Sequence, residues 1–213
     1  MEKGVKAKSH PGRKGGKESP AITAARDGHL EALQALPVEE ALSASDHNGC
    51  SCFHWAAGNG HLAICAFLVD LDPEVINALT WNQRTAMHYA ARNGRQEVCA
   101  WLLMQRAEAN AKARDEVSPL QLAVWQNHLQ TSRWFVEEAK ADPLQQNRFG
   151  CSVAHWLSQA PKDRAGEHGS SLIPLAEWLK SHGCDFGAVQ NHGHNCLHKA
   201  AWAGHLALCR WLR

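Results

Sequence analysis

Histidine and cysteine are the side chains through which this chain could bind a metal or act as a nucleophile, and it contains fourteen histidines and eight cysteines. Imidazole and thiolate groups are good zinc ligands, and a neighbouring histidine activates a thiol for nucleophilic attack. The densest group alternates through one short segment: His192, His194, Cys196 and His198. A smaller group has the same alternation: Cys50, Cys52 and His54. Neither has the C-x₂-C spacing of zinc sites, and although His194 and His198 have H-x₃-H spacing, no further pair completes four ligands, so we expect neither metal nor cofactor.

Motifs of the common enzyme classes give no support for catalysis either. The chain has no G-x-S-x-G, Walker phosphate loop, G-x-G-x-x-G, H-E-x-x-H or protein-kinase signature. The histidine–cysteine neighbours are explained by a repeat, described below. We therefore expect a protein that is not an enzyme.

The composition excludes several further classes. The 22 basic and 21 acidic side chains nearly cancel, which argues against a nucleic-acid-binding protein driven by bulk charge. No apolar run approaches the ~18 residues needed to cross a bilayer, so no membrane partner is expected. Eight cysteines without a signal peptide are typical of a reducing compartment, and the sequence thus favours the cytoplasm or the nucleus.

The histidines recur at a fixed interval, so the sequence is repetitive. The segment SCFHWAAGNGH, residues 51–61, returns in related form at 85–95, 118–128 and 195–205, and in a shorter form at 152–158. The fourth residue of each copy, called the anchor here, is in order His54, His88, Gln121, His155 and His198. The separations are 34, 33, 34 and 43 residues, and a degenerate first copy places its anchor, Ile22, 32 residues before His54.

A period of about 33 residues with a core close to T-P-L-H-x-A resembles the ankyrin repeat, a β-turn followed by two helices. Two repeat endings are also similar to the family's: Leu102-Leu103 followed by Ala107-Glu108-Ala109-Asn110, and Gly183-Cys184-Asp185-Phe186. The resemblance implies an all-α solenoid of helix-turn-helix units with connecting hairpin loops over residues 20–213. The expected repeats are 20–45, 46–79, 80–112, 113–146, 147–189 and 190–213.

Three segments depart from this regular pattern. Residues 1–19 carry six basic and two acidic side chains, a charge of +4, and are expected to form a disordered basic tail. The polar, glycine-rich segment 161–170 is expected to be a surface loop between the helices of the fifth repeat. The sixth copy ends within its second helix, so we expect either a fragment of a longer protein or an exposed apolar face.

Position within the repeat assigns most of the unusual residues to the scaffold. The resemblance implies that the anchor histidine is a structural hydrogen-bonding residue. A second set, seven residues after the anchor, opens the second helix: His29, His61, His128 and His205. An aromatic set thirteen residues after the anchor, once the ten-residue insertion of the fifth repeat is left out of the count, is predicted to form a stacked seam: Phe67, Trp101, Trp134, Trp178 and Trp211.

The resemblance also implies which residues face a partner: the hairpin residues before each copy and the two residues after the paired alanines. The hairpin positions are His47, Trp81, Arg84, Arg114, Arg148, Phe149, His192 and His194; the helix positions are Arg92, Trp125 and Trp202. This set has no acidic member and is rich in residue types that dominate interface energetics. We expect Trp125 to be its central anchor, and its replacement by alanine to leave the melting temperature nearly unchanged. The alternative is that these aromatics are scattered and covered by neighbouring repeats.

The function expected is non-catalytic protein–protein interaction through the concave groove. The expected partner is a protein or peptide, acidic and partly apolar, rather than a nucleic acid or a small molecule. The alternative is that the chain is the targeting domain of a larger enzyme or signalling protein.

Asn110 is an expected modification site. Leu102 lies eight residues before it and an alanine immediately before it, a setting similar to that of the hairpin asparagine hydroxylated in ankyrin proteins. We predict that the peptide containing Asn110, isolated from native-source protein, gains the mass of one oxygen, which peptide mass spectrometry measures. An unshifted peptide from several native sources would contradict the prediction.

Overall fold

The computed structural model describes residues 19–161 and 172–213. The expected disordered tail and inserted loop therefore lie outside the described residues, except for Ser19 and Pro161. Ser19 is not part of a tail, because its hydroxyl accepts a hydrogen bond from the Ala21 N–H and caps the first helix. The described residues form thirteen α-helices and a single isolated β-bridge, Ser45–Ser51. The all-α solenoid predicted from the sequence is confirmed.

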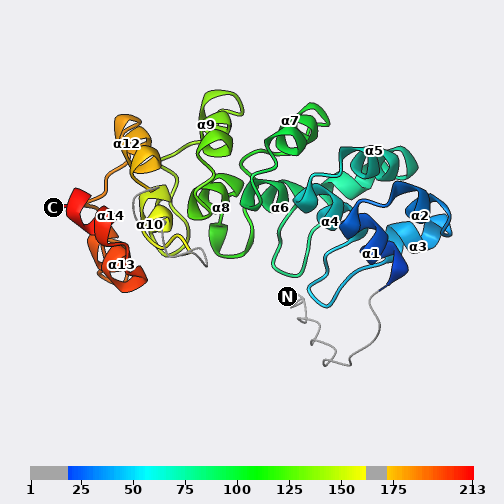
Figure 1. The fold of residues 1–213 in the computed structure, drawn as a ribbon, viewed down its shortest axis with the longest axis horizontal. Coiled ribbons are helices and arrows are strands. Elements are labelled where there is room, and N and C mark those ends of the chain that lie inside the picture. Colours follow the sequence, from blue (N-terminus) through cyan, green and yellow to red (C-terminus); the bar gives the residue numbers. More distant parts are fainter. Residues whose placement is uncertain (1–18, 162–171) are drawn as a thin grey trace, which may run out of the picture.

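Helices follow one another as antiparallel pairs that stack into an elongated array (Figure 1). The first helices form an inner row: α1 (Pro20–Asp27), α4 (Cys52–Asn59), α6 (Ala86–Arg92), α8 (Pro119–Trp125), α10 (Val153–Leu157) and α13 (Cys196–Ala203). The second helices form an outer row: α2 (Leu30–Gln34), α5 (Leu62–Leu71), α7 (Gln96–Met104), α9 (Leu129–Glu137), α12 (Ile173–Ser181) and α14 (Leu206–Trp211). Three shorter elements lie in the connections: α3 (Val38–Ser43) and the 3₁₀ helices η1 (Pro73–Asn77) and η2 (Arg114–Glu116). No helix among the described residues is long and apolar enough to span a bilayer.

Each inner helix after α1 begins with a capping box closed by the anchor side chain. In α6, Nδ1 of His88 accepts from the backbone N–H of Thr85 at 3.2 Å. In α8, the amide oxygen of Gln121 accepts from the Ser118 N–H at 3.1 Å. These bonds satisfy amide groups that the start of a helix otherwise leaves unpaired.

The opposite side of the anchor joins its repeat to the next one. Nε2–H of His88 donates to the Val117 carbonyl at 3.0 Å, and Nε2–H of His54 donates to the Arg84 carbonyl at 3.2 Å. Gln121 does the same with its amide nitrogen, 3.2 Å from the Cys151 carbonyl. All these anchors are buried, and the structural role expected of the anchor histidine is confirmed.

The histidines that open the outer helices make a second tie, in the opposite direction. Nε2–H of His61 donates to the Arg26 carbonyl of the preceding repeat at 3.0 Å, and His205 bonds the Ala160 carbonyl in the same way at 2.8 Å. The His61 ring lies so close to Gly28 that a Cβ there would come within 2.6 Å of it. Gly28 also has a φ of +84°, so glycine is required for both reasons.

The hairpins between repeats are closed by backbone bonds and joined to one another. The N–H of Thr80 donates to the Arg84 carbonyl within one hairpin at 3.0 Å. Between hairpins, one N–H per junction donates to the preceding hairpin: Trp81 to Asn48, Arg114 to Asn82, Arg148 to Asp115 and Asn191 to Phe149. The hairpins therefore form a continuous ladder along one edge of the array.

The predicted packing of the aromatic set in the core is confirmed, but its rings do not stack on one another. Its members are buried or half-buried against the core, but no ring pair among the described residues joins two of them. Cations lie over two of the rings instead: Arg133 over Trp178 at 6.0 Å and Lys180 over Trp211 at 5.3 Å. Packed helices stand about 8–10 Å apart, so rings at equivalent positions meet the intervening side chains rather than each other.

The buried anchors make stability depend on pH. Burial lowers the pKa of His88 to about 4 from its ordinary 6.5. Because the unfolded chain takes up this proton near pH 6.5 and the folded chain only near 4, stability falls as the pH drops through that window, by at most about 3 kcal/mol for this residue. We predict that His88→Gln, which copies Gln121, costs less than about 1 kcal/mol at pH 7.5 and reduces the loss of stability between pH 7.5 and 5 in urea unfolding.

The matched control is His88→Ala, which leaves both backbone partners unsatisfied and should cost about 2–4 kcal/mol at pH 7.5. The remaining pH dependence belongs to the other histidines with lowered pKa, His54 and His155 among them. Equal losses for the glutamine and alanine variants at pH 7.5 would contradict this account of the anchor.

Candidate partner-binding groove

An open groove of about 560 Å³ runs beneath the hairpins on the side of the inner helices. Its walls come from the hairpins that precede α6, α8, α10 and α13, and its floor from α10, α13 and Gln159. The lining residues are Asn82, Arg84, Arg114, Asp115, Val117, Asn147, Phe149, Cys151, His155, Trp156, Gln159, Gln190, His192 and Lys199. Four of the predicted partner-binding residues are brought together here: Arg84, Arg114, Phe149 and His192.

The charge of the groove is opposite to that of the folded chain. Residues 20–213 carry 16 basic and 19 acidic side chains, a net charge of −3. The groove is lined by three cations, Arg84, Arg114 and Lys199, and by one carboxylate, Asp115. That carboxylate pairs with Arg148 at 3.5 Å on the exposed hairpins, where an ion pair contributes little. The groove therefore carries a local excess of positive charge.

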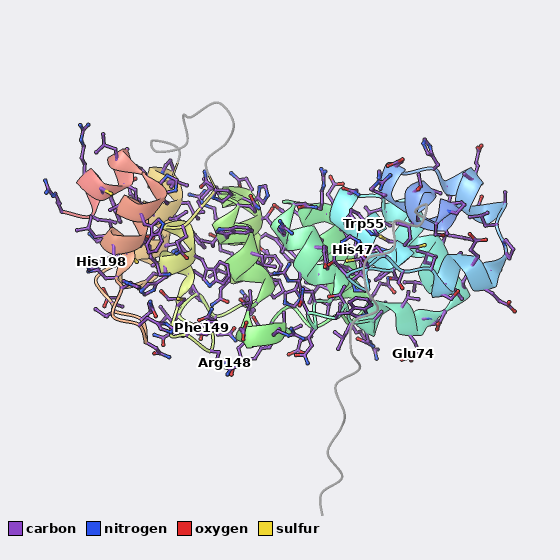
Figure 2. The ribbon with its side chains drawn as sticks, turned by 90° about the horizontal axis from the view of Figure 1, so that it is seen from below. His47, Trp55, Glu74, Arg148, Phe149 and His198 are labelled. Carbon is purple, nitrogen blue, oxygen red and sulfur yellow. The ribbon has the colours of Figure 1, made fainter. Side chains whose placement is uncertain are left out.

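Aromatic rings line the groove together with these cations. Trp156 lines the groove and packs with Trp125 against a small cluster of Ala113, Val117 and Leu122 that is separate from the main core. Phe149 is 39% exposed at a hairpin tip, with its ring 5.9 Å from that of His192. Figure 2 shows Phe149 beside Arg148 at one long edge of the molecule. The groove thus offers both a cationic rim and ring surfaces.

Sequence reasoning assigned neither Lys199 nor Trp156 to the groove. Both directly follow an anchor, His198 and His155 respectively, on the inner helices. The available signal was the position directly after the anchor. In the fifth and sixth repeats the hairpins do not cover this residue, so it lines the groove.

Trp125 joins two repeats rather than lining the groove. Its indole N–H donates to the Gln159 carbonyl at 2.9 Å, and its ring packs edge to face against Trp156 at 6.3 Å. The Arg92 guanidinium lies 5.6 Å from the centre of the Trp125 ring. These contacts argue against the expectation that Trp125 is removable without a cost in stability. Neither Trp125 nor Arg92 lines the groove.

Five further predicted residues lie apart from the groove lining, and two of them, His47 and His194, are exposed. The other three are Trp81, Arg148 and Trp202. Trp81 packs at a hairpin tip, where a Cβ on Gly49 would come within 2.6 Å of its ring. The Trp81 carbonyl accepts from the Arg114 guanidinium at 3.2 Å. Arg148 is exposed beside Asp115, and Trp202 is 87% exposed on α13. None of these three lines the groove, although Trp81 positions Arg114, which does.

The alternating histidines and cysteine near the last hairpin do not converge. Cys196 is fully buried, whereas His192, His194 and His198 are exposed. Among the described residues, no three histidine, cysteine or acidic side chains are placed to hold a metal ion. Burial also raises the pKa of the Cys196 thiol to about 11, so it remains protonated and unreactive at neutral pH.

Asn110 lies in the turn that follows α7 and is half-buried. The alanines on either side of it, Ala109 and Ala111, are buried. Its hydroxylation stays a prediction.

Comparison with protein families matches the chain to ankyrin repeats, in three copies, over residues 21–115 and 75–147. These two ranges together span more than half of the chain. The chain belongs to the ankyrin repeat family. Residues 148–213 lie outside the match, yet α10 and α13 begin with the same anchor-closed capping box as α4 and α6. Comparison with curated proteins gave no match.

The contacts of Trp125 predict a structural cost for its removal. Trp125→Ala should lower the free energy of unfolding by about 2–3 kcal/mol, because it removes a ring packed between repeats and its hydrogen bond. Trp125→Phe keeps a ring and should cost about 1 kcal/mol. Urea unfolding measures both, with Trp202→Ala as the exposed control at less than about 0.5 kcal/mol. A Trp125→Ala cost no larger than that of Trp202→Ala would show that the junction contact is unimportant.

Proposed function

We propose that this ankyrin repeat protein is an adaptor that binds an acidic, partly apolar segment of another protein in the groove between its hairpins and inner helices. Ankyrin repeats are generally protein–protein interaction modules and are typically non-catalytic. The observation that supports the finer proposal is the placement of Arg84, Arg114 and Lys199 around the rings of Phe149 and Trp156. The proposed place of action is the cytoplasm or the nucleus.

The two kinds of lining residue have different parts in this proposal. Exposed cations raise the rate of encounter with an acidic partner and select against basic ones. Affinity comes mainly from apolar side chains that become buried near the centre of an interface. Phe149 is suited to that part because its ring is exposed in the free protein and lines the groove.

The second candidate is that the same groove targets a larger enzyme or signalling protein of which this chain forms a part. The proposed chemistry of recognition is unchanged in that case. The two candidate functions differ in whether the reading frame of the transcript continues after the codon for Arg213. Sequencing the transcript distinguishes them.

A fluorescent peptide that alternates glutamate with leucine and phenylalanine is the probe for the proposed chemistry. We predict that the protein binds it more tightly than two matched peptides, one with lysine for glutamate and one with serine for the apolar residues. Arg114→Glu and Phe149→Ala should each weaken binding at least about tenfold, 1.4 kcal/mol. Both side chains are exposed, so the melting temperature should change little.

Lys112→Glu is the matched control, because Lys112 is exposed two residues from Arg114 and does not line the groove. It should leave the affinity within about twofold. Equal affinity for the acidic and basic peptides, or equal effects of Arg114→Glu and Lys112→Glu, would contradict the proposed function.

A further inference from the structure

The hairpin before α13 holds a histidine in a fixed ring orientation at the wall of the groove. Residues 190–194 form this hairpin, and His192 near its tip lines the groove. Asn82, Asp115 and Phe149 have the same place in the three preceding hairpins, and each of them also lines the groove. The placement of His192 toward the groove is therefore a property of its position in the repeat.

Gln190 is the residue that fixes the His192 ring. It begins the hairpin and is 6% exposed. Its side-chain oxygen accepts from the His192 backbone N–H at 2.7 Å, and this donor identifies the atom as the amide oxygen rather than the amide nitrogen. The same oxygen lies 3.1 Å from Nδ1 of the His192 ring. An amide oxygen can only accept, so Nδ1 carries a hydrogen and the neutral ring has its free lone pair on Nε2.

The neighbouring His194 is held in the opposite form by the same side chain. The Gln190 amide nitrogen, which can only donate, lies 3.2 Å from Nδ1 of His194. Nδ1 of His194 is therefore an acceptor, and a proton added there breaks this bond. His192 takes up a proton at Nε2 and keeps its bond to Gln190. The hairpin thus favours protonation of His192 over protonation of His194.

His192 shares the groove with several other groups that carry or can gain a charge. These groups come from the hairpins and from the inner helices α10 and α13: Arg84, Arg114, Asp115, Cys151, His155 and Lys199. Arginine, lysine and aspartate keep their charges between pH 6 and pH 8. Burial lowers the pKa of His155 and raises the pKa of Cys151, so both stay neutral over this range. Among the described residues that line the groove, His192 is the one whose charge can change there.

The surroundings of His192 determine when it becomes charged. The cations Arg84, Arg114 and Lys199 line the same groove and disfavour a further positive charge while the groove is free. A carboxylate bound among them has the opposite effect. The Phe149 ring, whose centre is 5.9 Å from that of His192, lies within the distance at which an aromatic ring attracts a cation.

We propose that His192 binds a carboxylate of the partner as an imidazolium, taking up one proton from the solvent when the carboxylate enters the groove. The proton adds to Nε2, and the new N–H donates to a carboxylate oxygen while Nδ1–H stays on Gln190. This proposal rests on the proposed function, because the carboxylate belongs to an acidic side chain of the partner. The groove therefore binds its partner more tightly as the pH falls from 8 to 6.

The affinity for the glutamate-containing peptide at pH 8 and at pH 6 tests the proposal. Because an imidazole takes up its proton near pH 6.5 and glutamate stays ionised throughout, the dissociation constant should fall at least about fivefold from pH 8 to pH 6. His192→Gln, which has no titratable group, should hold the affinity constant within about twofold. His194→Gln is the matched control and should keep the full pH dependence. His192→Arg, charged at both pH values, should bind at pH 8 as tightly as the unmodified protein binds at pH 6.

The sign of the pH dependence distinguishes the outcomes. Equal affinity at the two pH values, or a dependence that persists in His192→Gln, would overturn the proposal and leave the proposed function intact. Weaker binding at pH 6 than at pH 8 would also overturn it, since neutral His192 would then be accepting from a donor of the partner. A peptide that binds at neither pH would overturn both. Circular dichroism at each pH checks that the variants remain folded.

Nitrogen-15 NMR of the histidine rings tests the fixed tautomers without any peptide. At pH 8 the hydrogen should be on Nδ1 of His192 and on Nε2 of His194. The reverse arrangement would overturn the proposal even if the peptide binds.

Discussion

The two-sided hydrogen bonding of the anchor side chain is the interaction on which the rest of this structure depends. One polar atom accepts from the start of its own helix, and another donates to the hairpin of the next repeat. A helix pair cannot bury its apolar face alone, so helix formation and stacking have to be satisfied together. Gln121 meets both demands with an amide, which shows that the requirement is for a donor and an acceptor at fixed positions rather than for imidazole.

The repeat, its helix starts and the role of its histidines were predictable because each depends on contacts that recur from one repeat to the next. The aromatic contacts were not. The position of Trp178 in its repeat places it on the outer helix, but it does not say whether its ring meets another ring or Arg133. That choice depends on the lateral offset between neighbouring helices, which the sequence pattern does not encode. The same is true of Trp125, whose indole N–H reaches Gln159 in the next repeat.

The sequence predicted those residues of the groove that lie on the hairpins. Arg84, Arg114 and Phe149 are hairpin residues, and backbone bonds fix where a hairpin points. The floor was harder to foresee, because the residue after each anchor is covered in some repeats and open in others. Leu122 is buried in a small cluster, whereas Trp156 and Lys199 at equivalent positions face the groove. Only the three-dimensional fit of hairpin to helix separates these cases.

The ladder of backbone bonds between hairpins has a mechanical consequence. Four N–H to carbonyl bonds of 2.9–3.1 Å connect successive hairpins, so this edge resists stretching. The outer helices on the other side are held to one another by side-chain packing, which yields more easily. We therefore expect the hairpin edge to act as the hinge line when the array bends, with the distances between outer helices changing most. In that case the spacing between Arg84 and Arg114 is kept while the curvature of the array changes.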